Sequence, residues 1–218
     1  MKVSICVPIY GMEDGLKFLK RNISSIMNQT FKDYEIIVSD DSENDYFEKW
    51  FYEHPYIPVK YVRNQKTKGI AGNTNFAIDN AVGEIIKIMY QDDFFYQRTS
   101  LRDIVKHFTP TTYWLATGCI HTWDGVNLVN PHYPYYSESQ NTLGSPSVTA
   151  FKREVQTRFN PNYQWVVDLD FYKRLKKERG RPKIINDINV IIGWHMGQAT
   201  HKISGEKKEL EHKLLTNK

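Results

Sequence analysis

Two pairs of adjacent aspartates follow apolar runs in this sequence, Asp40 with Asp41, and Asp92 with Asp93 directly after Gln91. Carboxylate oxygens are the ligands that Mg²⁺ and Mn²⁺ prefer, and a divalent ion neutralises charge that develops on a diphosphate. A carboxylate at the end of a strand can also accept hydrogen bonds from a nucleotide base or a ribose. Each pair alone is equally typical of a capped loop, so the surrounding elements must decide between these interpretations.

A third acidic group and one histidine extend the set of candidate residues. Asp168 and Asp170 stand at the beginning of an amphipathic stretch, where a carboxylate facing a cleft can act as a general base toward a hydroxyl. The alternative is that both acids only stabilise the N-terminus of a helix. His195 lies in a segment with Gly193 and Gly197, where an imidazole can bind a metal or donate to phosphate, although a lone histidine is more often structural.

The elements that must position these residues alternate regularly in the first half of the chain. Apolar, β-branched runs predict strands and three- to four-residue apolar spacing predicts helices. The expected strands are 3–9, 34–39, 59–62 and 84–90, and the expected helices are 16–27, 46–52, 70–82 and 101–108. This alternation predicts a mostly parallel sheet flanked by helices, with a ligand site along its carboxyl edge.

The second half of the chain is less regular and rich in aromatic residues. Its expected strands are 114–120, 148–151 and 184–192, and its expected helices are 169–178 and the tail from residue 206. We find no internal repeat and no long linker. We therefore predict one α/β domain with a nucleotide-binding half, 1–108, and a smaller acceptor-binding and catalytic half, 109–218, that ends in a basic helix.

Composition limits the class of protein. The 218 residues are 40% hydrophobic and 25% charged, which is typical of a folded enzyme or binding module. The net charge of +4 does not indicate a nucleic-acid partner, but the C-terminal lysines can contact phosphates or an anionic membrane surface. Cys6 and Cys119 lie in apolar runs, so no disulfide framework is expected, and no run is long enough for a membrane span. These features favour a cytoplasmic protein, and they leave the oligomeric state open.

In their order along the chain, these motifs resemble those of the family 2 glycosyltransferases, which have the GT-A fold. Residues 3–10 (VSICVPIY) resemble the family's opening strand, and residues 27–31 (MNQTF) followed by 33–38 (DYEIIV) resemble its second unit. The likeness runs from Val3 to about Thr200. It implies an enzyme that transfers a sugar from a nucleotide sugar, most commonly a UDP sugar, to a hydroxyl of a glycan or glycoconjugate with the help of Mn²⁺ or Mg²⁺. A nucleic-acid acceptor is not expected.

The resemblance also implies a role for individual residues. Asp168 would be the catalytic base of a single displacement with inversion, and Asp93 would bind the metal together with His195. The residues expected to contact the donor are Pro8, Tyr10, Asp40, Asp41, Lys68, Asn75, Gln91 and Asp92. The residues expected to contact the acceptor are Ser145, Trp165 and Asp170.

Two positions depart from the family pattern. Thr74 stands where many members have a phosphate-binding arginine, for which Lys66 or Lys68 can compensate, and Val167 replaces the glutamate that commonly precedes the base. These departures keep open a nucleotide-sugar-binding protein without catalysis. A nucleotidyltransferase is the other alternative, but the loop after the first strand lacks the glycine-rich, basic sequence that such enzymes use to bind phosphate.

Overall fold

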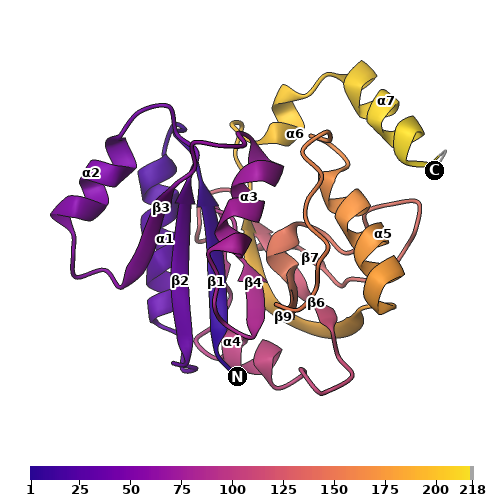
Figure 1. Ribbon diagram of the computed structural model, residues 1–218, viewed down its shortest axis with the longest axis horizontal. Coiled ribbons are helices and arrows are strands. Elements are labelled where there is room, and N and C mark those ends of the chain that lie inside the picture. The colour runs from indigo at the N-terminus through magenta and orange to yellow at the C-terminus, as the bar shows by residue number, and fades with distance from the viewer. Residues whose placement is uncertain (217–218) are drawn as a thin grey trace.

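The computed structural model describes residues 1–216, and its strands form one nine-stranded sheet of order β3-β2-β1-β4-β8-β6-β9-β5, with β7 paired to β6. Figure 1 shows the N-terminal half of this sheet on the left and the C-terminal half on the right. The elements of the first half are β1 (Val3–Ile9), α1 (Gly15–Met27), β2 (Tyr34–Asp40), α2 (Tyr46–Glu53), β3 (Val59–Arg63), α3 (Ile70–Asp79), β4 (Ile85–Ile88), β5 (Phe94–Phe95) and α4 (Ser100–Val105).

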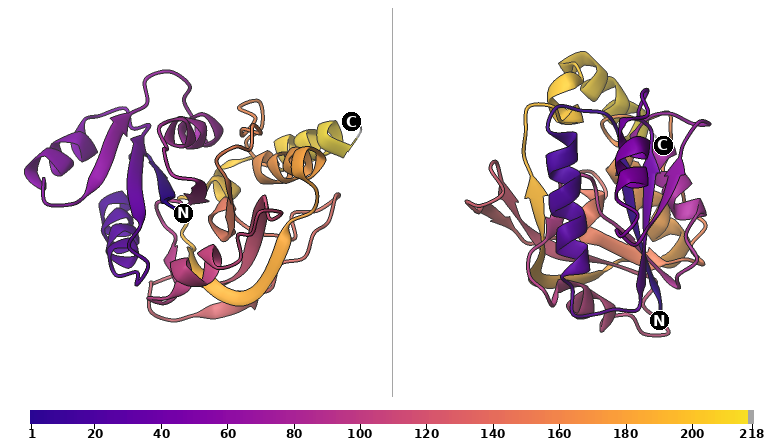
Figure 2. Two further views of the ribbon diagram at one scale, coloured as in Figure 1. Left: turned by 60° about the horizontal axis from the view of Figure 1, so that its bottom comes forward. Right: turned by 90° about the vertical axis from the view of Figure 1, so that its left-hand side faces the viewer.

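The first half is the parallel sheet that the sequence predicts. All residues of β1 and β4 are buried, because α1 and α3 lie on opposite faces of these strands (Figure 2). Strand β1 pairs in parallel with both β2 and β4, and β2 pairs in parallel with β3. The register sets Ile9 opposite Asp40, so the loops after β1 and β2 leave the sheet at the same edge.

The second half continues the same sheet with mixed strand directions. Its elements are β6 (Trp114–Thr122), β7 (Val129–His132), a 3₁₀ turn (Pro146–Val148), β8 (Thr149–Lys152), α5 (Val167–Arg179), β9 (Lys183–Gly193), α6 (Ala199–Lys202) and α7 (Gly205–Thr216). Strand β8 lies antiparallel to β4 and β6, whereas β9 runs parallel to β6. Strand β9 is long and curved, so the sheet curls around the helices that it packs against (Figure 2).

The cysteines and the fold class agree with the predictions made from the sequence. Cys6 and Cys119 are both buried free cysteines. The α/β fold class is confirmed, and the short strands β5 and β7 are additions that the sequence did not indicate. Within residues 1–216, no helix is long and apolar enough to cross a membrane.

Candidate active site

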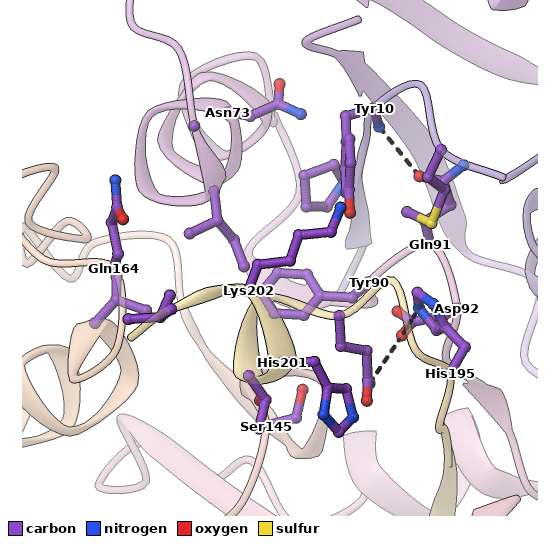
Figure 3. A pocket seen from close by; sticks show the side chains of 18 of the residues that line it. Tyr10, Asn73, Tyr90, Gln91, Asp92, Ser145, Gln164, His195, His201 and Lys202 are labelled. Atoms are coloured by element: carbon purple, nitrogen blue, oxygen red, sulfur yellow. Dashed lines mark hydrogen bonds and ion pairs between the residues drawn. The ribbon is translucent and has the colours of Figure 1, made fainter. Parts of the chain in front are cut away.

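A large cleft of about 1980 Å³ opens at the carboxyl edge of the parallel strands, between the two halves of the sheet. Figure 3 shows side chains from both halves and from the C-terminal segment pointing into it. The predicted site residues that line this cleft are Pro8, Tyr10, Asp41, Lys68, Gln91, Asp92, Asp93, Ser145, Trp165, Asp168 and His195. The structure therefore brings together all the acidic segments that the sequence predicts to meet.

Hydrogen bonds tie the loops on the N-terminal side of the cleft to one another. The carboxylate of Asp41 accepts a bond from the Gly69 backbone N–H at 2.6 Å, and its other oxygen lies 3.1 Å from Lys68 Nζ. Gln91 accepts a bond from the Tyr10 backbone N–H at 3.1 Å and donates to the Gly15 carbonyl at 2.9 Å. The Asp41 backbone N–H also donates to the Ile9 carbonyl at 3.0 Å, so the loops after β1, β2, β3 and β4 form one connected wall.

His195 meets Asp92 rather than Asp93. Its Nε2 lies 3.2 Å from Asp92 Oδ2, and both side chains keep some exposure to the cleft, 16% and 14%. The carboxylate of Asp93 is buried and accepts bonds from the Gly193 backbone N–H at 3.0 Å and from Ser145 Oγ at 3.4 Å. Burial, and next the neighbouring Asp92, raise the pKa of Asp93 well above its ordinary value.

The chemistry of the Asp92–His195 pair fits a divalent ion whose remaining ligands come from a substrate and from water. Mg²⁺ and Mn²⁺ are commonly held by one or two protein groups together with phosphate oxygens and water. Among residues 1–216, no cluster of three or more histidines, cysteines or acids is arranged to hold an ion by itself. Asp92 and His195 offer one carboxylate and one imidazole, which are ligand types that such an ion accepts.

Helix α1 supports the acid pair from behind. Arg21 donates from Nη2 to the Asp92 carbonyl at 2.8 Å, and its guanidinium lies 4.3 Å from the centre of the Phe94 ring. Asn22 donates from Nδ2 to the Asp93 carbonyl at 2.9 Å. Gly193 completes the packing, because a Cβ there would lie 2.4 Å from the Asp92 carbonyl oxygen. Sequence reasoning missed this support, although polar residues on the sheet-facing side of an amphipathic helix could have indicated it.

Asp168 enters the cleft from the first turn of α5. One carboxylate oxygen accepts a bond from Asn141 Nδ2 at 3.2 Å. Burial raises the pKa of Asp168 from its ordinary 3.8 to about 7. A carboxylate with this pKa has a higher proton affinity than an exposed aspartate, yet it is mostly ionised just above neutral pH, which suits a general base.

The family comparison accords with this geometry. The family model described as Glycosyl transferase family 2 matches residues 4–176. The chain belongs to this family. A curated relative, the GalNAc(5)-diNAcBac-PP-undecaprenol beta-1,3-glucosyltransferase of Campylobacter jejuni, is 38% identical over 95 residues, which are 42% of this chain and 30% of that protein. Chondroitin synthase of Escherichia coli is 28% identical over 202 residues, or 85% of this chain and 28% of the synthase. This family 2 chain thus spans about 30% of the length of these relatives.

Solved structures show the same fold. Residues 1–349 of Staphylococcus aureus TarS, in complex with UDP-GlcNAc, superpose with a TM-score of 0.75 and 17% identity, covering 100% of this chain and 66% of that one. The mannosyltransferase PcManGT from Pyrobaculum calidifontis, in complex with GDP-Man and Mn²⁺, has a TM-score of 0.66 and 19% identity, covering 91% of this chain and 58% of that one. The predicted GT-A fold and family are confirmed.

Asp40 lies behind the cleft of this family 2 chain. Its side chain is fully buried, and its two oxygens accept bonds from Tyr61 Oη at 2.5 Å and from the Ser42 backbone N–H at 2.8 Å. Asp41, the next residue, faces the cleft instead. The hydrogen bonds of the Asp40 side chain thus lie with β3 and with the backbone of its own loop, and they direct it away from the cleft. Asp40 is placed to hold the loop rather than the donor.

Two further residues with predicted ligand contacts lie away from the cleft. Asn75 exchanges two hydrogen bonds of 2.8 Å with the backbone of Phe159, and so joins α3 to the segment before α5. Asp170 is buried and forms an ion pair of 2.5 Å with Arg174, one turn further along α5. Both side chains use their hydrogen-bonding capacity within the protein, so neither is placed to contact the donor or the acceptor directly.

The two departures from the family pattern also have a structural place. Thr74 is fully buried and donates to the Ile70 carbonyl at 2.7 Å, so its side chain is part of the helix packing. Of the two lysines considered as substitutes for the missing arginine, Lys68 lines the cleft and Lys66 does not. Val167 is buried at the beginning of α5.

The C-terminal segment adds a cationic side to the cleft. Sequence reasoning treated its lysines as a basic tail, but Lys202, Lys207 and His201 all line the cleft, and Figure 3 shows Lys202 beside Tyr10. Glu211 attaches α7 to the N-terminus of α5, where its buried carboxylate accepts bonds from three consecutive backbone N–H groups, including that of Trp165 at 2.7 Å. This segment therefore lies over the same helix end that carries Asp168.

Proposed function

We propose that this chain is an inverting, metal-dependent glycosyltransferase that moves a sugar from a nucleoside-diphosphate sugar to a hydroxyl of a glycan or glycoconjugate. The observation that carries the proposal is that Asp168, whose pKa is raised to about 7, opens onto the same cleft as the Asp92–His195 pair. A base and a candidate metal-holding pair on one cleft are the groups that direct sugar transfer requires.

The wall formed by the loops after β1, β2 and β3 is proposed to bind the nucleotide. Asp41 has a carboxylate suited to a base N–H or a ribose hydroxyl, and Lys68 beside it carries a charge that complements phosphate. Tyr10 and Pro8 supply apolar surface at the same place. We favour a UDP sugar because TarS binds UDP-GlcNAc in its solved complex and a 33% identical Escherichia coli relative, WfgD, is named for a UDP-Glc donor.

We propose that Asp92 and His195 would hold the metal. This replaces the pairing of Asp93 with His195 in the sequence-based prediction, because both oxygens of Asp93 are engaged by Gly193 and Ser145. When bound, Mn²⁺ or Mg²⁺ would neutralise the charge that develops on the departing diphosphate. The Mn²⁺ in the PcManGT complex supports this choice of ion.

The reaction is proposed to be a single displacement. Asp168 accepts the proton of the acceptor hydroxyl while the hydroxyl oxygen forms a bond to the anomeric carbon. The bond between that carbon and the diphosphate oxygen breaks on the opposite side, and the nucleoside diphosphate leaves with the electron pair. The configuration at the anomeric carbon inverts, and no covalent enzyme intermediate forms. Asn141 orients the base through its hydrogen bond of 3.2 Å.

The acceptor class rests on the relatives and on the cleft. Two of the curated relatives are named for acceptors linked to undecaprenol diphosphate, which are glycoconjugates. On the side of Asp168, the cleft is lined by Ser145, Asn141 and Trp165, whose hydroxyl, amide and indole groups suit a sugar.

A nucleotide panel in a thermal-shift assay tests the donor proposal. With Mn²⁺ and ligand at 100 times its Kd, the expected stabilisation is about 2.7 kcal/mol, or roughly 5–10 °C for a chain of this size. We expect UDP to give this shift and GDP or CMP to give a smaller one. If no nucleotide shifts the melting temperature with Mn²⁺ present, donor binding is refuted.

Slow hydrolysis of a UDP sugar tests the metal assignment. Asp92→Asn and His195→Ala should each reduce Mn²⁺-dependent release of UDP by at least about tenfold, as expected for loss of a metal ligand or its neighbour. Asp187→Asn, at an exposed position outside the cleft, is the control and should behave as wild type. Unchanged Mn²⁺ dependence in Asp92→Asn would refute the assignment.

A further inference from the structure

Three aromatic rings form a platform on the wall of the cleft, at the ends of β6 and β9. They are His121, Trp123 and Trp194, and all three line the cleft. The ring centres of His121 and Trp194 are 4.4 Å apart, and those of Trp123 and Trp194 are 5.3 Å apart at 62°. Trp123 is 57% exposed despite this packing. A large aromatic face is thus presented to the cleft.

The turn that carries Trp123 is fixed by its own hydrogen bonds. The Asp124 carboxylate accepts bonds from the backbone N–H groups of Val126 and Asn127, both at 2.8 Å. Gly125, at φ 85°, packs against the guanidinium of Arg21. Trp194 donates its backbone N–H to the Thr122 carbonyl at 2.7 Å, which joins the two ends of the platform. A ring held in this way loses little conformational freedom when a ligand packs on it.

None of the three rings of the platform carries a charge. The neighbouring Asp124 is a charged carboxylate, but it does not line the cleft, and its oxygens accept bonds from donors in its own turn. His121 Nδ1 is bonded to the Asn130 carbonyl at 2.8 Å, and burial lowers the pKa of this imidazole, so the ring is neutral at pH 7. An uncharged aromatic face does not suit a phosphate, but it suits the C–H face of a pyranose ring, which is apolar although its rim carries hydroxyls.

The position of the platform favours the acceptor over the nucleotide of the donor. Strands β6 and β9 belong to the C-terminal half of the sheet, whereas the loops proposed to bind the nucleotide follow β1, β2 and β3 of the N-terminal half. Trp194 is next to His195 in the sequence, so the platform adjoins the proposed metal-binding pair. The amides of Gln140 and Asn141 line the same cleft and can bond to hydroxyls at the rim of the ring. We propose that His121, Trp123 and Trp194 form a saccharide subsite that stacks on a sugar ring of the acceptor. This inference rests on the proposed function and specifies a neutral saccharide as the acceptor part that is recognised.

An alternative occupant is an alkyl chain of a lipid-linked acceptor. Val126 and Leu128 are exposed further along the same hairpin, by 79% and 39%, but neither lines the cleft. The cleft-facing part of the hairpin is aromatic and the apolar aliphatic part lies outside it. The arrangement therefore favours a sugar ring inside the cleft.

Saturation-transfer NMR with defined sugars tests the subsite. The protein is saturated with UDP and Mn²⁺, and the probes are the methyl β-glycosides of glucose, galactose and N-acetylglucosamine, cellobiose, chitobiose and octyl β-glucoside. We expect at least one saccharide to bind, and Trp123→Ala to weaken its binding about tenfold, as loss of a stacking face should. Trp123→Phe keeps a ring and should remain within about threefold of wild type. Tyr52→Ala, at an 87% exposed aromatic residue outside the cleft, is the control and should leave binding unchanged.

The outcomes separate this proposal from the proposed function. Equal saccharide binding by wild type and Trp123→Ala overturns the subsite, as does the absence of binding by every probe to a protein that binds UDP normally. With octyl β-glucoside, saturation that reaches the protons of the octyl chain but not those of the sugar ring overturns the subsite in favour of a lipid contact. Failure of wild type to bind UDP in the same samples counts against the proposed function instead, because saccharide binding is measured separately.

Discussion

Replacing Asp168 by asparagine should strongly reduce transfer and at the same time stabilise the folded protein. The folded pKa of about 7 lies above the ordinary 3.8, so the folded state binds this proton more tightly than the unfolded state does. The stabilisation that proton binding at Asp168 gives to the folded state is therefore complete below about pH 4 and is lost as the pH rises to 7. Above pH 7 the buried carboxylate is ionised and destabilises the fold, and asparagine removes that cost.

The size of this effect follows from the two pKa values. The difference between 3.8 and about 7 corresponds to at most about 4.5 kcal/mol, at about 1.4 kcal/mol for each pKa unit. Because the Asp168 carboxylate retains contact with solvent in the cleft, we expect a smaller gain of about 1–2 kcal/mol at pH 8. For a chain of this length, that gain raises the melting temperature by roughly 3–6 °C.

Thermal unfolding at pH 5 and pH 8 measures the effect, with no ligand present. The difference in melting temperature between Asp168→Asn and wild type should be larger at pH 8, where the Asp168 carboxyl is ionised, than at pH 5, where it is mostly protonated. The other titrating groups are common to both proteins and do not contribute to this difference. Asp187→Asn should show no such difference, and transfer by Asp168→Asn at pH 8 should fall by about 10²–10⁴-fold. A variant that is no more stable than wild type at pH 8 would refute the argument that the carboxyl is desolvated.

Three other perturbations have defined outcomes. In wild type, kcat/KM should rise about tenfold for each pH unit below 7 and level off above it, since Asp168 must be ionised to accept a proton; a flat profile from pH 5.5 to 8 would contradict this. Gly193→Ala should reduce Mn²⁺-dependent UDP release at least about tenfold, because the new Cβ would lie 2.4 Å from the Asp92 carbonyl, whereas Gly205→Ala has open space and should have little effect. Glu211→Ala should destabilise the attachment of α7 by about 1–3 kcal/mol and speed amide exchange at residues 164–166; slow exchange there would show that other contacts hold α7.

The parallel half of the fold could be predicted because burial on both faces leaves a plain signal in the sequence. Strand β1 is apolar along most of its length, and α1 shows a clear helical spacing. The short strands β5 and β7 leave no such signal. The two residues of β5 are in a strand only because they pair with β9, and the antiparallel direction of β8 is likewise set by contacts with distant segments.

The candidate site was predictable to the level of segments but not of single side chains. The strand order brings the loops after β1, β2 and β4 to one edge, so the acidic segments had to meet. Which acid of a pair faces the cleft depends on the path of the backbone after the strand ends. The alternation of side chains that holds within a strand does not apply there. Asp41 and Asp92 keep some exposure to the cleft, Asp93 lines the cleft although its carboxylate is buried, and Asp40 lies behind it. The roles of these residues remain predictions until variants are measured.

The continuous sheet has a consequence for how the protein can be divided and how it can move. Strand β4 of the N-terminal half is hydrogen-bonded to β8 of the C-terminal half, so no flexible boundary separates them near residue 108. A fragment ending there would leave the apolar edge of β4 without its neighbour and should aggregate. For the same reason the halves cannot swing about a hinge, and enclosing a substrate must depend on loops and on the segment from α6 to α7.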